Sequence, residues 1–405
     1  MNVVTNARAA RALRPNSSPP AVYITRIAQA VCGASLLALS TAMAQVPAVH
    51  QAGPAPAFWV IDASTEMVGM GQGLPVFALQ RDDWPRYRTG SGEVARAFRS
   101  TRFTLSATHT SGWQIGTLLR TEASLEASRD AVDLAALNAN GADPPTPRDF
   151  GIHAIGQGWQ AAGIVVGTPW LAVDTQKRWH GHVQLQLMTL RQLRADAISG
   201  FANYQGGGSY DFALQSQRSR DDLAAPFLQA SNSAGRAASV SFALTAAPTD
   251  NWKLQLRAED FFSLLDWPGM ATESATLNSR VLGSVSDGTL NYAPLISGRN
   301  TLERGQGRMG ARWVADLVWS PRIWRDGGGA SFRAERKLGL EQYWLGWDQT
   351  AQQAGGFTWR LEIEPTVRAA SFTSSWRNWE GALATDGRGA GSELTQLRLA
   401  WRSRF

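Results

Sequence analysis

The segment "NWKLQLRAEDFF", residues 251–262, alternates apolar and polar side chains with a period of two. Successive residues of an extended chain point in opposite directions, so this period places alternate side chains on opposite faces of a β-strand. One face would carry Trp252, Leu254, Leu256 and Ala258, and the other would carry Lys253, Gln255, Arg257 and Glu259. The segment therefore predicts a long amphipathic strand.

The same alternation recurs in "GWQIGTLLRTEASLEA" (112–127), "RWHGHVQLQLMTL" (178–190) and "GFTWRLEIEPTVRAA" (356–370). Strands of globular proteins have about five or six residues, whereas a tilted strand of about 9–11 residues crosses the hydrocarbon core of a membrane. Long runs that are apolar on one face and polar on the other are typical of membrane barrels. We therefore predict an all-β fold, a transmembrane antiparallel up-and-down β-barrel. The alternative is a soluble β-sandwich or β-solenoid with its tryptophans in the core.

Counting the runs predicts about fourteen strands, with about twelve or sixteen as the alternatives. They would begin near residues 58, 98, 112, 150, 160, 178, 209, 236, 251, 270, 308, 329, 356 and 392. Long connections at 70–97, 127–149, 219–235 and 375–391 would lie outside the cell, and the short turns "HTSGW" and "AAPTDN" in the periplasm. The segment 284–307 is long yet falls on the periplasmic side, so it would hide a further hairpin or fold inwards as a plug.

Tryptophan is abundant, with 17 in 405 residues, and several lie near the predicted strand ends. Aromatic side chains gather there in membrane barrels, because their amphipathic rings sit at the level of the lipid headgroups. The predicted membrane girdle comprises Trp113, Trp179, Trp252, Trp313, Trp319, Trp344, Trp359 and Trp401.

The amino terminus has the pattern of a secretory signal peptide over residues 1–44. Four arginines precede an apolar stretch that ends in Ala42-Met43-Ala44, which matches a basic region, an apolar core and a small-residue cleavage site. The alternative is a membrane anchor, although Gly and Ser interrupt the stretch. Residues 45–57 would form a short periplasmic segment, and residues 58–405 the barrel.

Cleavage would change the composition of the exported chain. It would remove Cys32, the one cysteine, so disulfides and thiolate chemistry are not expected. It would also remove Arg8, Arg11, Arg14 and Arg26, leaving 39 − 4 = 35 cationic side chains against 33 acidic ones, a net charge of +2 instead of +6. This balance gives no support to nucleic-acid binding.

The chain ends with "LTQLRLAWRSRF", residues 394–405, an amphipathic strand whose last residue is aromatic. In this ending the sequence resembles the broad class of bacterial outer-membrane β-barrel proteins, which typically end in such a strand. The matching residues are Leu397, Leu399, Trp401 and Phe405, with arginines on the opposite face, whereas Ser403 departs from the alternation. The resemblance implies a Gram-negative outer membrane, contact with its lipids and lipopolysaccharide, and recognition by the barrel-assembly machinery.

The predicted inward face carries charges of both signs. It comprises Lys253, Arg257, Glu259, Arg312, Asp316, Arg333, Glu335, Lys337, Arg360, Glu362, Glu364, Arg368, Arg398 and Arg402. A charged lumen enclosed by about fourteen strands favours a porin-like channel or transporter for small hydrophilic solutes. The alternative is that opposite charges pair across neighbouring strands and close the interior.

His180 and His182 are the weak catalytic candidates, because their spacing places both imidazoles on one face of a strand. A metal site or an acyl-transfer site would need a third partner, and the sequence identifies none. A barrel enzyme that modifies outer-membrane lipid is therefore an alternative function. A structural or assembly barrel for surface-polysaccharide export is another. No cofactor and no metal are predicted, since the glycine-rich segments lack the residues of a phosphate-binding loop.

Overall fold

The computed structural model describes residues 59–76, 93–220, 234–279, 281–284, 290–292, 296–321, 328–350, 357–388 and 392–404. The predicted signal peptide, the segment 45–57 and Phe405 lie outside these ranges. Within them, no helix has the length and apolar character needed to cross a membrane.

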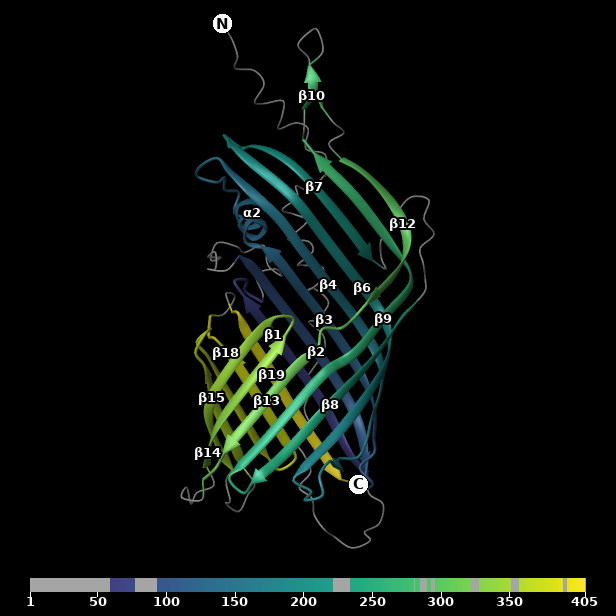
Figure 1. The fold of residues 1–405 in the computed structure, drawn as a ribbon, viewed down its shortest axis with the longest axis vertical. Helices are drawn as coiled ribbons and strands as arrows, with labels where there is room; N and C mark the ends of the chain where they lie inside the picture. The colour runs from purple at the N-terminus through teal and green to yellow at the C-terminus, as the bar shows by residue number, and fades with distance from the viewer. Residues whose placement is uncertain are drawn as a thin grey trace.

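The described strands form a closed antiparallel barrel with 14 strand positions (Figure 1). The circle closes where β1 (Trp59–Gln72) pairs with β19 (Leu394–Arg404), from Val60 opposite Arg404 to Met70 opposite Leu394. A closed antiparallel β-barrel of about this size is the fold that the sequence predicts. The other full-length positions are β2 (Val94–His109), β3 (Gln114–Ser128), β4 (Arg148–Gly167), β6 (Trp179–Gly206), β9 (Trp252–Asn278), β14 (Gly328–Lys337), β15 (Leu340–Thr350), β16 (Thr358–Glu364), β17 (Ala369–Trp376) and β18 (Trp379–Thr385).

Two positions are each shared by a pair of shorter strands. β7 (Ser209–Arg220) and β8 (Gly235–Thr249) lie end to end between β6 and β9. β12 (Ile296–Gly307) pairs with the upper part of β9, and β13 (Arg312–Trp319) pairs with its lower part. The two-residue β5 (Leu171–Ala172) and the small hairpin of β10 (Val281–Ser284) and β11 (Leu290–Tyr292) complete the strands of the described ranges.

The predicted number of strands is confirmed, but several predicted boundaries are wrong. The runs beginning at 150 and 160 are one strand, β4, and those at 251 and 270 are one strand, β9. The runs at 329 and 356 are each two strands, joined by tight turns at 338–339 and 365–368. The predicted loop 375–391 contains β18, and part of the predicted plug, 296–307, is the wall strand β12. The middle of the predicted loop 219–235 lies outside the described residues.

One side of the barrel is much taller than the other. β4, β6 and β9 have 20, 28 and 27 residues, whereas β16, β17 and β18 have 7, 8 and 7. Figure 1 shows the upper parts of β4, β6, β7, β9 and β12 standing above the short strands as a one-sided wall. The C-terminal end of β19 marks the opposite, lower end of the barrel.

Apolar side chains cover the outside of the closed part. Ile115, Leu119, Ile164, Leu185 and Phe262 are all exposed there, as expected for a surface that meets lipid. Near the lower turns most of the exposed aromatics are tryptophans, and Trp252 stacks on Trp319 with ring centroids 5.9 Å apart. Of the predicted girdle, Trp113, Trp252, Trp313 and Trp319 are exposed, and Trp179, Trp359 and Trp401 are partly exposed on outward-facing positions.

The one described helix, α2 (Arg129–Ala139), packs on the outer face of the tall wall. The odd-numbered side chains of β3 all lie on one face, because β3 pairs with β4 without a bulge. This face is exposed at Ile115, in the closed part of the barrel, and buried at Ala127, in the tall wall. Val132 and other side chains of α2 bury the upper part of that face. Ser128 caps the helix by accepting a bond from the Ala131 N–H, 3.2 Å. The helix therefore does not plug the lumen.

Trp344 is a correction to the predicted girdle. It is 0% exposed and points into the barrel, where the Arg333 guanidinium lies 4.7 Å from its ring centroid. It belongs to an internal apolar cluster with Val68, Met70 and Phe98. The reason is register: on β15, outward positions are taken by Tyr343, Leu345 and Trp347, so the even-numbered Trp344 must face inwards.

Candidate functional site

A layer of buried ion pairs crosses the inside of the barrel at mid-height. At its centre lies Arg120 of β3, whose side chain is 1% exposed. Its guanidinium holds Asp260 with both nitrogens, Nη1 to Oδ1 at 2.8 Å and Nη2 to Oδ2, and its Nη2 also donates to Glu122 Oε1 at 2.5 Å. Such bidentate, charge-assisted bonds fix geometry as well as charge.

Asp260 reaches this layer because β9 bulges at that point. Its φ is +55°, and the pairing of β9 with β8 shifts register beside it. A bulge re-aims a side chain, so the adjacent Glu259 and Asp260 both point inwards. Ser239 and Ser241 of β8 hold Asp260, through Oγ to Oδ1 at 2.6 Å and the Asp260 N–H to Oγ at 3.1 Å.

Lys337 and Arg312 extend the layer across the lumen. The Lys337 ammonium lies 3.5 Å from Glu122, donates to the Gly310 carbonyl at 2.5 Å and sits over the Phe98 ring. Arg312 binds Glu335 at 2.6 Å and, on the far side of the strand order, Glu66 of β1 at 2.8 Å. Strands that are not neighbours in the sheet are thereby tied together through the interior.

Further pairs fill the interior beside the short strands. They are Arg333 with Glu362 (3.1 Å), Arg360 with Asp316 (3.2 Å) and Arg398 with Glu380 (2.8 Å). Apolar side chains pack above the layer, including Trp159, Met188, Leu190, Trp267 and Met309. Opposite charges therefore pair in the interior, as one alternative from the sequence predicted. Most of the pairs join strands that are not neighbours, whereas that alternative placed the pairing across neighbouring strands.

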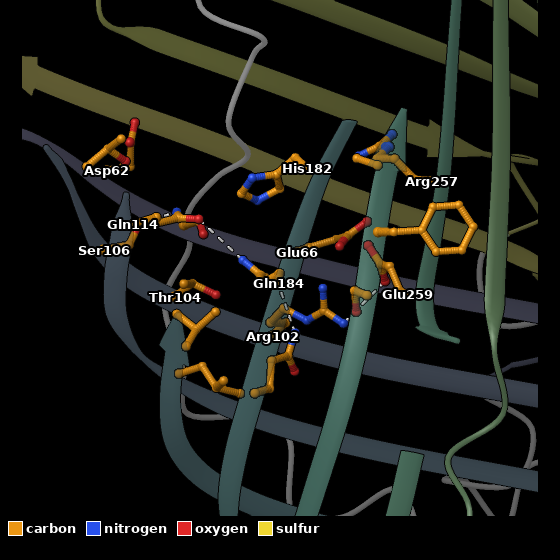
Figure 2. A pocket seen from close by; sticks show the side chains of 18 of the residues that line it. Asp62, Glu66, Arg102, Thr104, Ser106, Gln114, His182, Gln184, Arg257 and Glu259 are labelled. Atoms are coloured by element: carbon orange, nitrogen blue, oxygen red, sulfur yellow. Dashed lines mark hydrogen bonds and ion pairs between the residues drawn. The ribbon is translucent and has the colours of Figure 1, made fainter. Parts of the chain in front are cut away.

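A chamber of about 300 Å³ lies between this layer and the lower turns (Figure 2). Figure 2 shows Glu66, Gln114, His182 and Gln184 directed towards it. β1, β2, β3, β6, β8 and β9 all contribute to its lining. The lining combines two kinds of uncharged side chain. The hydrogen-bonding ones are Ser64, Thr104, Ser106, Thr108, Gln114, Gln184, Gln186, Ser241 and Gln255, and the apolar ones are Val60, Ala63, Leu118, Val165, Trp170, Phe242 and Ala243.

The charged residues that line the chamber are already bound to opposite charges. Arg402 Nε donates to Asp62 Oδ1 at 2.5 Å, and Arg102 Nη2 to Glu259 Oε2 at 3.2 Å. Arg257 Nη2 lies 3.7 Å from Asp316 Oδ2. Glu66 is paired with Arg312 of the layer. The lining itself contains three acids and three arginines, so its formal charges balance.

A chain of side-chain amides links the layer to the chamber. Arg120 donates to Gln186 Oε1 (3.4 Å), Gln186 to Gln184 Oε1 (3.2 Å), Gln184 to Gln114 Oε1 (3.4 Å), and Gln114 to Ser106 Oγ (2.8 Å). Arg120 can only donate, so it sets the direction of every amide below it. The last acceptor, the Ser106 hydroxyl, keeps its own proton available to the chamber.

His182 lies in the chamber wall, and its surroundings do not support a catalytic role. Its Nδ1 bonds the Thr168 carbonyl at 2.7 Å, which requires a proton on Nδ1, and its ring stacks on Trp170 at 5.2 Å. His180 lies lower, opposite Ala172 of β5. In the described ranges no three His, Cys, Asp or Glu side chains are grouped to hold a metal ion.

Most of the predicted lumen residues point into the interior, with two differences. Lys253 shares the inward face of β9 but lies exposed at its lower end. Arg368 does not line the lumen, which corrects the prediction: it is exposed in the upper turn 365–368 with φ +59°. Glu364 is buried beside that turn and accepts the Val367 N–H at 2.7 Å.

The prediction missed Glu66, Arg102, Arg120, Glu122 and Asp260. The pattern of "LLRTEAS" does place Arg120 and Glu122 opposite Leu119, so the alternation already carried that signal. The adjacent acids of "RAEDFF" break the alternation, and such a break is the sequence sign of a bulge.

No protein-family model and no curated protein matches the sequence. Among solved structures, the TodX deltaS2S3 mutant monoaromatic hydrocarbon channel is similar at 10% identity and TM-score 0.40, over 86% of this chain and 91% of that chain. A FadL homologue of Pseudomonas aeruginosa is similar at 9% identity and TM-score 0.18, over 86% and 88%. The alcaligin outer membrane receptor FauA from Bordetella pertussis is similar at 10% identity and TM-score 0.15, over 85% and 76%. These values are too low to transfer a function.

Proposed function

We propose that the protein is a restricted outer-membrane channel for small polar solutes, whose passage is controlled by the ion-paired layer. The observation that carries the proposal is the order of features inside the barrel. A chamber lined by hydroxyl, amide and apolar side chains lies below, and a layer of buried, paired charges lies directly above it. In this arrangement the layer is the obstruction that a solute in the chamber meets.

The lining supports passage of polar solutes in particular. A water-filled lumen needs polar walls, and β1, β2, β3, β6, β8 and β9 each place at least one hydroxyl or amide side chain in the lining, among apolar ones such as Val165 and Phe242. The ion pairs can also act as a closure that opens, because Arg120, Arg312 and Arg360 each have more than one acid within reach. Arg360, for example, lies near Asp316, Asp348 and Glu362.

The orientation and route to the membrane belong to the same proposal. The lower end, with the C-terminal end of β19, would face the periplasm, and the tall wall would stand on the cell surface. Cleavage after Ala44 would precede assembly, and the amphipathic β19, paired with β1, would be the strand that the assembly machinery reads.

Osmotic swelling of proteoliposomes tests the proposed function. We expect the folded protein to admit a pentose such as arabinose faster than protein-free liposomes do. A trisaccharide such as raffinose should enter much more slowly, because the chamber holds only about 300 Å³.

The matched control is the same preparation of protein that was never folded into the bilayer, which should leave the liposomes as tight as empty ones. Folded protein that admits no solute of any size would contradict a channel function.

A further inference from the structure

We infer that the chamber is a binding site for a neutral, hydroxyl-rich solute the size of a monosaccharide. The inference rests on the proposed function and names the class of solute. Three properties of the lining support it. Its charged side chains are already in ion pairs, its amide side chains have a fixed hydrogen-bond direction, and Trp170 and His182 form an aromatic surface.

The charges select against an ion. Asp62, Glu259 and Arg402 each hold an opposite charge within 3.2 Å, and the acids and arginines of the lining balance. A charged solute would therefore have to break an existing ion pair or give up its water without receiving a counter-charge, and both are costly. A neutral solute meets neither cost.

The hydrogen-bonding groups suit hydroxyls. The Gln184–Gln114 amides are held in one orientation from Arg120, and Ser106 ends that chain with a hydroxyl proton to donate. The His182 ring carries its proton on Nδ1, so its Nε2 is an acceptor. Hydroxyl groups donate and accept at one atom, so a polyol can satisfy the donors and the acceptors of this lining together.

An apolar surface and an open space complete the site. Trp170 and His182 both line the chamber, and their rings stack with an angle of 22° between them. They hold each other in place as an aromatic surface that the C–H groups of a sugar ring can contact. Gly167 makes room beside it. A Cβ at that position would lie 2.7 Å from His182 Cε1 and 2.9 Å from Gln114 Oε1.

The test is a titration of the full-length protein, folded in detergent, with three ligands of similar shape. We expect measurable binding of neutral glucose by calorimetry, and binding at least about tenfold weaker for cationic glucosamine and anionic gluconate. Gln184→Leu and Trp170→Ala should each weaken glucose binding about tenfold or more. Gln217→Leu, an exposed amide on the upper wall, is the matched control and should leave it unchanged.

Gln184→Glu keeps the inference open to refutation if the truncations misfold. It should weaken glucose binding and strengthen glucosamine binding, because it places an uncompensated carboxylate in the chamber. Tighter binding of either charged ligand by the unaltered protein, or no binding of glucose, would overturn the inference. Swelling with arabinose but no glucose binding refutes the site alone, whereas glucose binding without any solute entry refutes the channel alone.

Discussion

Asp260→Asn should destabilise the folded barrel by about 3–5 kcal/mol, the effect of removing one partner from a buried ion pair. The change leaves the buried Arg120 without the carboxylate that it binds in a bidentate manner, and it removes a nearby charge from Lys337, 3.8 Å away. Neither cation can reach water, since both side chains are 1% exposed. Urea unfolding in lipid vesicles, followed by tryptophan fluorescence, measures the loss.

Asp266→Asn is the matched control for that experiment. Asp266 is also held by both nitrogens of one arginine, with Arg304 Nε at 2.6 Å and Nη2 at 3.0 Å. That arginine is largely exposed on the tall wall, and exposed pairs contribute little because water replaces them. We expect no measurable change. Equal effects at the two sites would mean that burial of the Arg120 pair does not matter.

Trp344→Ala should cost about 3–5 kcal/mol, as for other fully buried aromatic side chains. The change leaves a cavity among Val68, Met70 and Phe98, and it removes the ring beneath the Arg333 guanidinium. Both losses fall on the same internal cluster, so the barrel should unfold at clearly lower urea concentration with an unchanged slope.

Trp347→Ala provides the comparison on the same strand. Trp347 is three residues further along β15, faces outwards and is partly exposed. Its truncation removes lipid contact without creating an internal cavity, so a smaller loss is expected. A larger effect at Trp347 than at Trp344 would contradict the inward assignment of Trp344.

The alternation of apolar and polar residues was enough to predict the class of fold and, for most strand residues, whether the side chain points into or out of the barrel. In "RWVADLVW" and "TWRLEIE" the polar residues Arg312, Asp316, Arg360 and Glu362 all turn inwards, as the period of two requires. The wider pattern also predicted that these charges would be of both signs. It could not predict the partners, because pairing across the lumen depends on the heights at which distant strands meet.

Strand boundaries were less predictable because the turns are hidden in the runs. β14 and β15 are joined by Leu338 and Gly339, both with positive φ, and β17 and β18 by a turn with Arg377 at φ +54°. Neither turn contains the Asn-Gly sequence that is the strongest signal of a two-residue hairpin turn. In β6 the buried Leu190 and Leu193 are three residues apart, since a bulge lies between them. The phase of the alternation slips there, and the extent of the tall wall is not readable from the pattern.

The most direct test of the central claim is the single-channel conductance of the double variant Arg120→Ala/Asp260→Ala in planar bilayers. This variant removes both partners of the central ion pair, so neither partner is left as a buried charge without the other. The layer should therefore open while the barrel stays folded. We expect a time-averaged current several-fold above that of the unaltered protein, and no increase for Arg304→Ala/Asp266→Ala, the exposed bidentate pair. Unchanged conductance in a folded Arg120→Ala/Asp260→Ala barrel would contradict the claim that the ion-paired layer closes the lumen.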